Sequence, residues 1–273
     1  MKHSSSTSSV STLSNMQSGY VPPKEGELIP LLDEMSPYVT PKDHQLALNL
    51  YDSFLNHPQE WNTLDDKVGM RTASSKQIYS FNPSKKNPSE SRPRFIIGIS
   101  GIVPGTPTEW INLMYTDKVK NKICKHFSQR FQVEYKSIDE QQGIHYPNSI
   151  IYMEAPLPFP MTNRDFLVSK TIIPDKYDPS TGEYGRYIMI QKPSYHHEFP
   201  PVAKSAVRAN HTIVYIVEKK GNASVRYTCL ETGDMLGNIP AKITAQFFKS
   251  TAKVMHKKIR KVCSSAYESH VQK

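Results

Sequence analysis

An acidic and a basic residue stand on either side of a proline-broken apolar loop in the segment IIYMEAPLPFPMTNRDFLV, residues 150–168. Successive side chains of a strand point to opposite faces, so each flanking strand presents a defined set of residues to one side. If the strands pair around the loop 155–163, Glu154 and Arg164 can meet, and on an inward face they would form a buried ion pair. Such a pair either specifies the fold or anchors a ligand inside an apolar cavity, and both interpretations stay open.

The loop itself carries three apolar side chains between its prolines, Leu157, Phe159 and Met161. Loops usually lie at the surface, where a cluster of apolar residues requires an explanation. These side chains can form a lid over a cavity, dip into a membrane interface or cover the edge of a core. The sequence alone leaves all three roles open.

Signatures of enzymes are missing from the sequence. Ten histidines are present, but there is no HExxH motif and no paired Cys/His spacing for a metal. The segment GISGIVPG, residues 98–105, is not a dinucleotide-binding glycine motif, and Ser100 is no nucleophile elbow because Ile102 stands where the second glycine belongs. We therefore predict a protein that is not an enzyme and uses no metal or cofactor.

The composition is typical of a globular protein, with 37% hydrophobic and 22% charged residues among 273. A net charge of +9 favours anionic partners, either acidic lipid surfaces or nucleic acid. The basic residues are scattered and form no recognisable nucleic-acid module, so we expect no nucleic acid to bind. Three cysteines without CxxC spacing indicate reduced thiols in the cytoplasm, and no apolar run approaches the roughly 20 residues of a spanning helix.

Two helices begin with the same sequence device. Residues 1–39 are expected to form a disordered, serine-rich tail, after which Thr40 and Asp43 form a capping-box pattern at the start of a four-turn helix. Thr106 and Glu109 repeat the pattern for a second helix, expected to continue to about residue 127. Short alternating segments separated by turns then predict antiparallel strands at 94–103, 131–138, 148–154, 164–173, 186–193, 205–218 and 224–231.

A long amphipathic helix is predicted at the end of the chain, over residues 240–266. One side forms a broad apolar stripe of Ile243, Phe247, Phe248, Val254, Met255, Ile259 and Val262, and lysines and arginines crowd the rest of the helix. The order helix, strands, helix, strands, helix fits an α+β fold in which a curved antiparallel sheet wraps around this closing helix.

Four segments, in order along the chain, resemble motifs of START domains, the steroidogenic-regulatory-protein-related lipid-transfer modules. PFPMTNRDF (158–166) is similar to their Arg-Asp segment and YHHEFPP (195–201) to their His-Pro region. AVRANHTIVYI (206–216) resembles their Val-Arg strand, and DMLGNIP (234–240) the turn before the closing helix. The resemblance covers about 41–266, with Trp61 at the first strand region, and is strongest to the phosphatidylcholine-transfer-like group.

The resemblance implies a helix-grip fold, with a START domain over 40–273 and a tunnel between sheet and closing helix that holds one lipid. It implies lipid binding and transfer between membranes by a monomer that is cytoplasmic and peripheral at anionic membranes. The lipid would be a glycerophospholipid such as phosphatidylcholine; the alternatives are a sterol or ceramide carrier, or a lipid-sensing regulatory module without transfer activity. The loop 155–163, with Leu157, Phe159 and Met161, would touch the membrane.

The residues expected to contact the lipid come from the motif strands and from the closing helix: Tyr152, Met153, Glu154, Arg164, Phe166, Arg208, Ile243, Phe247 and Phe248. Arg208 can instead pair with an acid at the surface. Two positions depart from the choline-binding pattern, in which aromatic rings surround the cation. Met153 stands where that pattern has Trp, and Phe166 where it has Tyr. The segment 120–131 also lacks the family's Trp-Asp pair, so the choline cage is weakened.

Overall fold

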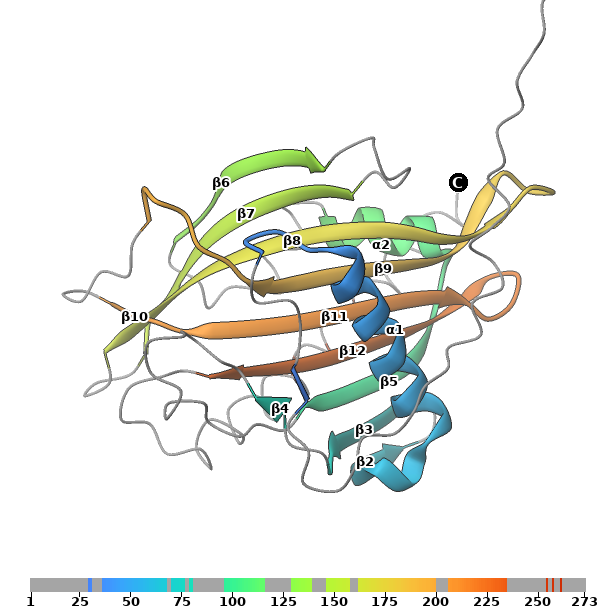
Figure 1. Cartoon of the computed structure of the whole chain (residues 1–273). Coiled ribbons are helices and arrows are strands. Elements are labelled where there is room, and N and C mark those ends of the chain that lie inside the picture. Colours follow the sequence, from blue (N-terminus) through green and yellow to red (C-terminus); the bar gives the residue numbers. More distant parts are fainter. Residues whose placement is uncertain are drawn as a thin grey trace, which may run out of the picture.

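The fold was analysed in a computed structural model of the whole chain (Figure 1). The residues that the structure describes are 29–30, 36–67, 70–76, 79–80, 96–115, 129–138, 146–157, 162–199 and 206–234, with the single residues 254, 257 and 261. Packed structure begins before the expected boundary at Thr40, because Val39 is fully buried and its N–H donates to Oδ1 of Asn148 at 3.0 Å.

One curved ten-stranded sheet dominates the molecule, in the spatial order β2-β3-β5-β12-β11-β9-β8-β7-β6, with β10 beside β8 (Figure 1). Its strands are β2 (Trp61–Lys67), β3 (Met70–Ser75), β5 (Ile97–Pro104), β6 (Gln129–Ile138), β7 (Tyr146–Ala155), β8 (Asn163–Asp178), β9 (Glu183–Pro193), β10 (Ala206–Arg208), β11 (Asn210–Lys219) and β12 (Ser224–Asp234). All neighbours are antiparallel except β10 and β8. The predicted antiparallel sheet is thus confirmed. The short strands β1 (Ile29–Pro30) and β4 (Tyr79–Ser80) pair separately.

Helix α1 (Pro41–Asn56) lies across one face of the sheet, here called the α1 face (Figure 1). The predicted capping box is present, since the side chains and backbone N–H groups of Thr40 and Asp43 bond each other reciprocally. Ala47, Leu50 and Phe54 are buried against apolar side chains of the sheet. The 3₁₀ turn η1 (Pro58–Glu60) follows and leads into β2, which begins at Trp61 as expected.

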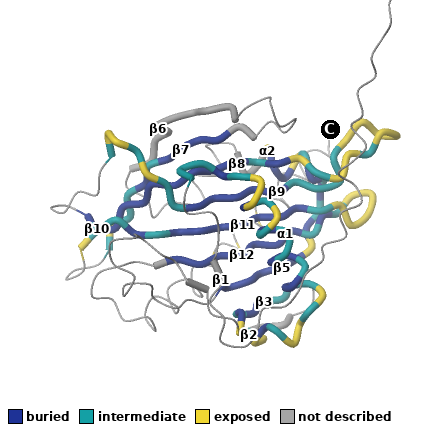
Figure 2. The backbone as a smooth tube through the Cα atoms, viewed as in Figure 1, coloured by how far each residue is buried: buried dark blue, intermediate teal, exposed yellow. Residues whose placement is uncertain are grey.

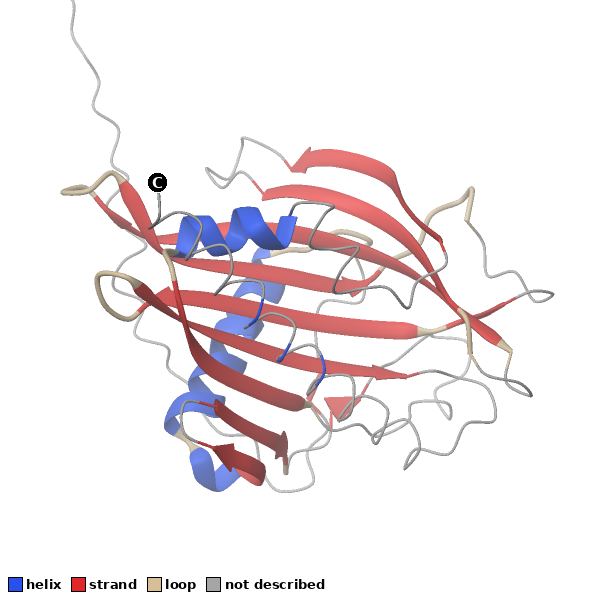
Figure 3. Ribbon diagram, turned by 180° about the vertical axis from the view of Figure 1, so that it is seen from behind, coloured by secondary structure: helices blue, strands red, loops and turns tan. Residues whose placement is uncertain are grey.

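Helix α2 (Pro107–Tyr115) covers part of the opposite face, here called the α2 face (Figure 3). Its capping box is also confirmed: the N–H of Thr106 donates to Oε2 of Glu109 at 2.8 Å, and the N–H of Glu109 to Oγ1 of Thr106 at 3.2 Å. Trp110 and Ile111 pack into an apolar cluster on this face. The expected continuation to residue 127 lies outside the described residues.

Both faces of the central strands are covered, as the long buried stretches of β8, β9 and β11 show (Figure 2). In β8 every residue from Arg164 to Thr171 is buried, although successive side chains point to opposite faces. A sheet with one wet face would instead alternate between buried and exposed positions. The α1 and α2 faces therefore belong to two separate apolar clusters.

Most of the predicted closing helix lies outside the described residues. Val254, Lys257 and Lys261 are helical, and their spacing of three and four places them on one side of that helix. Val254 is 46% exposed and both lysines are exposed. Val254, which was predicted as part of the apolar stripe, therefore lies on an exposed side of the helix together with two lysines.

Candidate functional site

The predicted ion pair between Glu154 and Arg164 does not form. The register of β7 and β8 sets Glu154 opposite Asp165, and Ala155 opposite Arg164. Directly opposed residues share a face, so Glu154 and Arg164 point to opposite sides of the sheet. The motif strands were identified correctly, but a one-residue shift in the register between β7 and β8 moves a side chain to the other face of the sheet. The sequence of the loop does not determine that register.

Arg164 lies on the α2 face and is only 3% exposed. Its Nη1 donates to the carbonyl oxygen of Thr162, and to that of Asn163 at 3.3 Å. Arg164 thereby holds the backbone where the loop 155–163 enters β8. Within the described residues its guanidinium supports the base of the loop.

Asn163 joins the two ends of the same loop. Its Nδ2 donates to Oε1 of Glu154 at 3.2 Å, and its Oδ1 accepts from the N–H of Leu157 at 3.3 Å. Leu157 is half-buried and packs against the α2-face cluster. The other two predicted membrane contacts, Phe159 and Met161, lie outside the described residues.

Asp165 and Arg208 form an ion pair on the α1 side of β8. Oδ2 of Asp165 accepts from Nε of Arg208 at 3.1 Å and from its Nη2 at 2.9 Å, and Nη2 also donates to the carbonyl oxygen of Phe199 at 3.2 Å. Arg208 therefore pairs with an acid, as one of the two expected roles had it, but this acid is buried and not at the surface. That acid is the aspartate of the Arg-Asp motif, so the pair fastens β10 and the segment before it to β8.

The predicted lipid contacts are divided between the two faces. Met153 and Phe166 oppose each other in register on the α2 face, 4% and 5% exposed, and the Phe166 ring lies 5.8 Å from that of His211. Tyr152 faces the other side, where it lies 5.6 Å from the Phe199 ring, and burial raises the pKa of its hydroxyl. The predicted contacts on the closing helix, Ile243, Phe247 and Phe248, lie outside the described residues.

The structure brings together a row of polar residues that the sequence did not single out. The pairing of five neighbouring strands aligns Ser149 with Lys170, Lys170 with Gln191, Gln191 with Ile213, and Ile213 with Glu231. Alternation along the strands puts all of these side chains on the α2 face. The polar row is the four polar members of this alignment, Ser149, Lys170, Gln191 and Glu231, which are between 4% and 8% exposed.

His211 adds a fifth polar side chain at the edge of the polar row. It is 9% exposed, and its Nε2 lies 2.7 Å from Oε1 of Glu231. Burying charged groups among apolar side chains is unfavourable unless they are paired or hydrogen-bonded. A sequence signal existed: Lys170 interrupts the apolar positions 166, 168 and 172, which share its side of β8.

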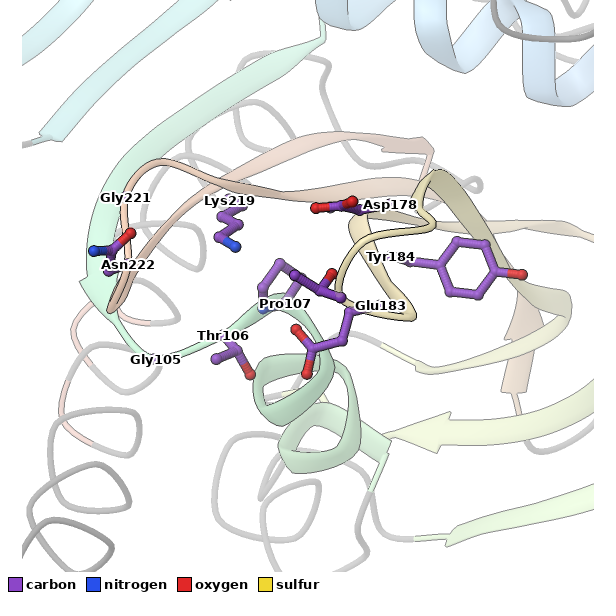
Figure 4. A pocket seen from close by; sticks show the side chains of 11 residues that line it. Gly105, Thr106, Pro107, Asp178, Glu183, Tyr184, Lys219, Gly221 and Asn222 are labelled. Carbon is purple, nitrogen blue, oxygen red and sulfur yellow. The ribbon is translucent and has the colours of Figure 1, made fainter.

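A small pocket lies at the opposite end of the strands, where three turns converge (Figure 4). Thr106 and Pro107 line it from the start of α2, Asp178 and Glu183 from the β8–β9 turn, and Lys219 from the β11–β12 turn. Its volume of about 80 Å³ is below the ~300 Å³ of the smallest ordinary ligand sites. This pocket is separate from the polar row and too small for a lipid.

The described part of the chain contains neither a candidate membrane-spanning helix nor a cluster of metal ligands. No helix there is long and apolar enough to cross a membrane. Nor do three or more histidine, cysteine, aspartate or glutamate side chains gather there as metal ligands would.

The large antiparallel sheet, its helices on both faces and the motif strands β7 and β8 define a START-type helix-grip fold. Solved structures share it: human STARD10 superposes with a TM-score of 0.65 at 19% identity, over 89% of this chain and 87% of that chain. Human StAR-related lipid transfer protein 5 gives 0.54 at 14%, over 82% and 97%. The lipid transfer and protein localization domain of human StarD13 gives 0.53 at 19%, over 78% and 96%.

The predicted START fold is therefore confirmed by structures whose sequences are only distantly similar. No protein-family model matches the chain, and no curated protein sequence matches it. The likeness lies in the arrangement of the strands and helices, and it leaves the ligand to be inferred from the site.

Proposed function

We propose that this protein binds one lipid against the α2 face of its sheet and carries it between membranes, acting as a carrier rather than an enzyme. The observation that carries the proposal is the polar row, which crosses a face lined mainly by apolar side chains. A surface with one polar band and a large apolar remainder complements an amphiphile. The names of two structural neighbours, which refer to lipid transfer, agree with this class of ligand.

The free energy of hydration explains why a carrier is needed. Each CH₂ group of an acyl chain removed from water contributes about 0.8 kcal/mol, so free lipid leaves a membrane slowly. The apolar side chains of the α2 face, among them Met153, Phe166 and Val168, would shield the chains during transit. The polar row would meanwhile replace the hydration of the headgroup.

A zwitterionic glycerophospholipid, with phosphatidylcholine first, is the proposed ligand. The polar row holds both signs of charge, with Lys170 suited to a phosphate and Glu231 to an ammonium group. The departures at Met153 and Phe166 count against a full aromatic cage around choline. A sterol or a ceramide would use the same apolar face with fewer charges, and remains the alternative ligand.

The proposed exchange of lipid takes place at a membrane surface. The net charge of +9 would draw the monomer from the cytoplasm to an anionic leaflet, where each suitably placed basic residue contributes roughly 1 kcal/mol. The loop 155–163 is proposed to be the mouth, with Phe159 and Met161 as its membrane contacts. Arg164 and Asn163 would fix both of its ends while its middle opens.

Native mass spectrometry of the purified protein, followed by extraction of bound lipid, tests the proposal. We expect one phospholipid per chain. The variant Lys170→Met keeps the length of the side chain but loses its charge, and should reduce phospholipid loading at least about tenfold. The matched control is Lys219→Met, an exposed lysine at the turn end of β11, which should load normally.

The other outcomes each have a defined meaning. A sterol or sphingolipid in the extract would support the carrier function but replace the glycerophospholipid as the proposed ligand. A chain that stays empty after incubation with mixed lipid vesicles would contradict lipid binding.

A second candidate, a lipid-sensing interaction module, is favoured by one surface feature. Tyr195 is 63% exposed and stands next to the stacked rings of His196 and His197. The pair Asp165–Arg208 holds this segment through Phe199. A fixed group of exposed rings is typical of a protein contact. Normal lipid binding without transfer between vesicles would select this candidate.

A further inference from the structure

Trp110 buries a hydrogen-bond donor that has no acceptor. The side chain is 2% exposed on the inner side of α2, and its Nε1 has no hydrogen-bond partner within the described part of the chain. Trp61 provides the contrast, because its Nε1 donates to Oγ of Ser53 at 3.0 Å on the α1 face. Buried donors in native proteins are nearly always satisfied, so an orphan donor at a ligand face indicates a missing acceptor.

The position of Trp110 relative to the polar row is set by its ring contacts. Its ring centroid lies 6.1 Å from that of Tyr215 and 6.4 Å from that of Tyr227. Tyr215 opposes Cys229 in the β11–β12 register, and Cys229 and Tyr227 lie two and four residues before Glu231 on the same face. At ~3.3 Å per residue, Trp110 therefore lies about 7–13 Å along the strand from the polar row.

A second buried donor stands at the same level of the sheet. Thr72 of β3 is fully buried, and its Oγ1 lacks a partner among the described residues. Thr72 opposes Ile99, which in turn opposes Cys229. The α2 face thus has two polar levels, the polar row and a pair of unpartnered donors further along the strands.

Trp110 is held in place before any ligand arrives. The capping box of Thr106 and Glu109 fixes the start of α2, and the hydroxyl groups of Thr108 and Tyr187 lie 3.2 Å apart, which fastens the helix to β9. Because the Trp110 side chain is already held in place, little conformational entropy is lost when its N–H bonds an acceptor.

We propose that Nε1 of Trp110 donates a hydrogen bond to an ester carbonyl oxygen of the bound glycerolipid, so that the protein selects acyl esters over ether lipids. The inference rests on the proposed lipid-carrier function and specifies its substrate class. The ester groups lie between headgroup and chains, so a headgroup at the polar row brings the carbonyls toward Trp110. An ether-linked lipid has the same headgroup and chains but lacks these acceptors. Thr72 is available to the second carbonyl.

Competition between matched lipids tests the inference. The protein is incubated with vesicles containing equal amounts of diacyl and dialkyl phosphatidylcholine of identical chain length, and, in a second set, the corresponding anionic phosphatidic acids. Native mass spectrometry separates the two bound species by mass. We expect the diacyl form to be favoured by about three- to tenfold, the range of one hydrogen bond. Trp110→Phe should bring the ratio close to one.

Trp61→Phe is the matched control, since it makes the same substitution at the chain's other tryptophan. It removes a donor that is already used inside the protein, so it should lower stability and leave the diacyl preference unchanged. An indole N–H signal that shifts on loading with diacyl lipid but not with dialkyl lipid would support the inference independently.

Each remaining outcome overturns one statement. Equal loading of diacyl and dialkyl lipid by the unchanged protein, or a diacyl preference that survives Trp110→Phe, would overturn the role of Trp110 and leave the carrier function standing. If the protein loads neither lipid from either set, or loads only a sterol, the proposed glycerolipid-carrier function is overturned, and the inference with it.

Discussion

Two charged residues far apart in the sequence meet in the least exposed ion pair of the described structure. Nζ of Lys192 lies 2.8 Å from Oδ2 of Asp43, with the side chains 2% and 0% exposed. Asp43 also accepts from the N–H of Thr40 as part of the cap of α1. The sequence predicted the capping role of Asp43, whereas its partner on β9 depends on where α1 docks.

Removing one member of this pair should be costly. Lys192→Met removes the cation that is paired with the buried carboxylate of Asp43, and should lower the free energy of unfolding by about 3–5 kcal/mol. Adding Asp43→Asn should recover part of the loss, because no charge is then buried alone. Urea denaturation of both single variants and the double variant measures this; strictly additive losses would contradict the pair.

Glu218 gives the protein a predictable response to acid. Burial opposes its charge, but Lys176 and Lys220 donate to the carboxylate and hold the pKa at about 2, against an ordinary value of 4.5. A lowered pKa in the folded state means that the contribution to stability is complete above pH 4.5. It is lost as the pH falls from 4.5 through 2, when the folded protein finally takes up the proton.

Thermal unfolding between pH 7 and pH 2 should therefore show a stability loss that depends on Glu218. Glu218→Gln should lower the melting temperature at pH 7 and flatten the decline below pH 4.5. Glu198→Gln serves as the control, because that carboxylate is exposed and its removal should leave the profile unchanged. Parallel profiles for the unchanged protein and Glu218→Gln would contradict the prediction.

At the scale of elements, α1 sits on the sheet at a position that only glycine permits. A Cβ atom added to Gly98 of β5 would lie 2.3 Å from Cε2 of Phe54, which is closer than Cβ atoms approach other heavy atoms in real structures. The edge of the Phe54 ring also meets Trp61, with ring centroids 4.9 Å apart at 84°. Helix, strand β5 and the start of β2 therefore share one tightly packed contact.

Gly98→Ala should push α1 away from the sheet and destabilise the protein by about 1–3 kcal/mol. Phe54→Leu in the same chain should restore part of that loss, since it removes the ring atoms in the way. Gly185→Ala is the matched control, because its nearest contact would be an ordinary 3.4 Å. Denaturant midpoints measure all of these; equal effects at both glycines would refute the packing explanation.

Local patterns predicted the elements well, and their mutual arrangement poorly. The capping boxes at Thr40 and Thr106 depend only on neighbouring residues, so they were identified from the sequence. The predicted Glu154–Arg164 ion pair depends on the register of β7 and β8, and each single-residue shift of that register moves a side chain to the other face. This prediction was wrong. The four members of the polar row are aligned through four such registers, and no local pattern encodes their combination.

At the scale of the whole molecule, binding and membrane contact are assigned to different parts. The polar row lies on the α2 face, whereas the proposed mouth is the loop between β7 and β8. Polar replacements at the mouth should therefore affect the rate of exchange and spare the capacity to hold lipid.

Phe159→Ser combined with Met161→Ser should slow lipid transfer between vesicles several-fold, because less apolar surface reaches the interface. Lipid loading at equilibrium and the melting temperature should stay unchanged. A fluorescent-lipid transfer assay with anionic acceptor vesicles measures the rate. An unchanged rate, or a loss of rate that follows a loss of stability, would reject this mouth.

The spread of the polar row along the sequence has a consequence for when, relative to translation, the proposed lipid can bind. Its members come from residues 149, 170, 191 and 231, so the row is incomplete until β12 has joined the sheet. A nascent chain that has emerged from the ribosome only as far as β9 already contains Lys170 and lacks Glu231. The proposed lipid is thus expected to bind only after translation has delivered the last strand, so a bound lipid would indicate a completed fold.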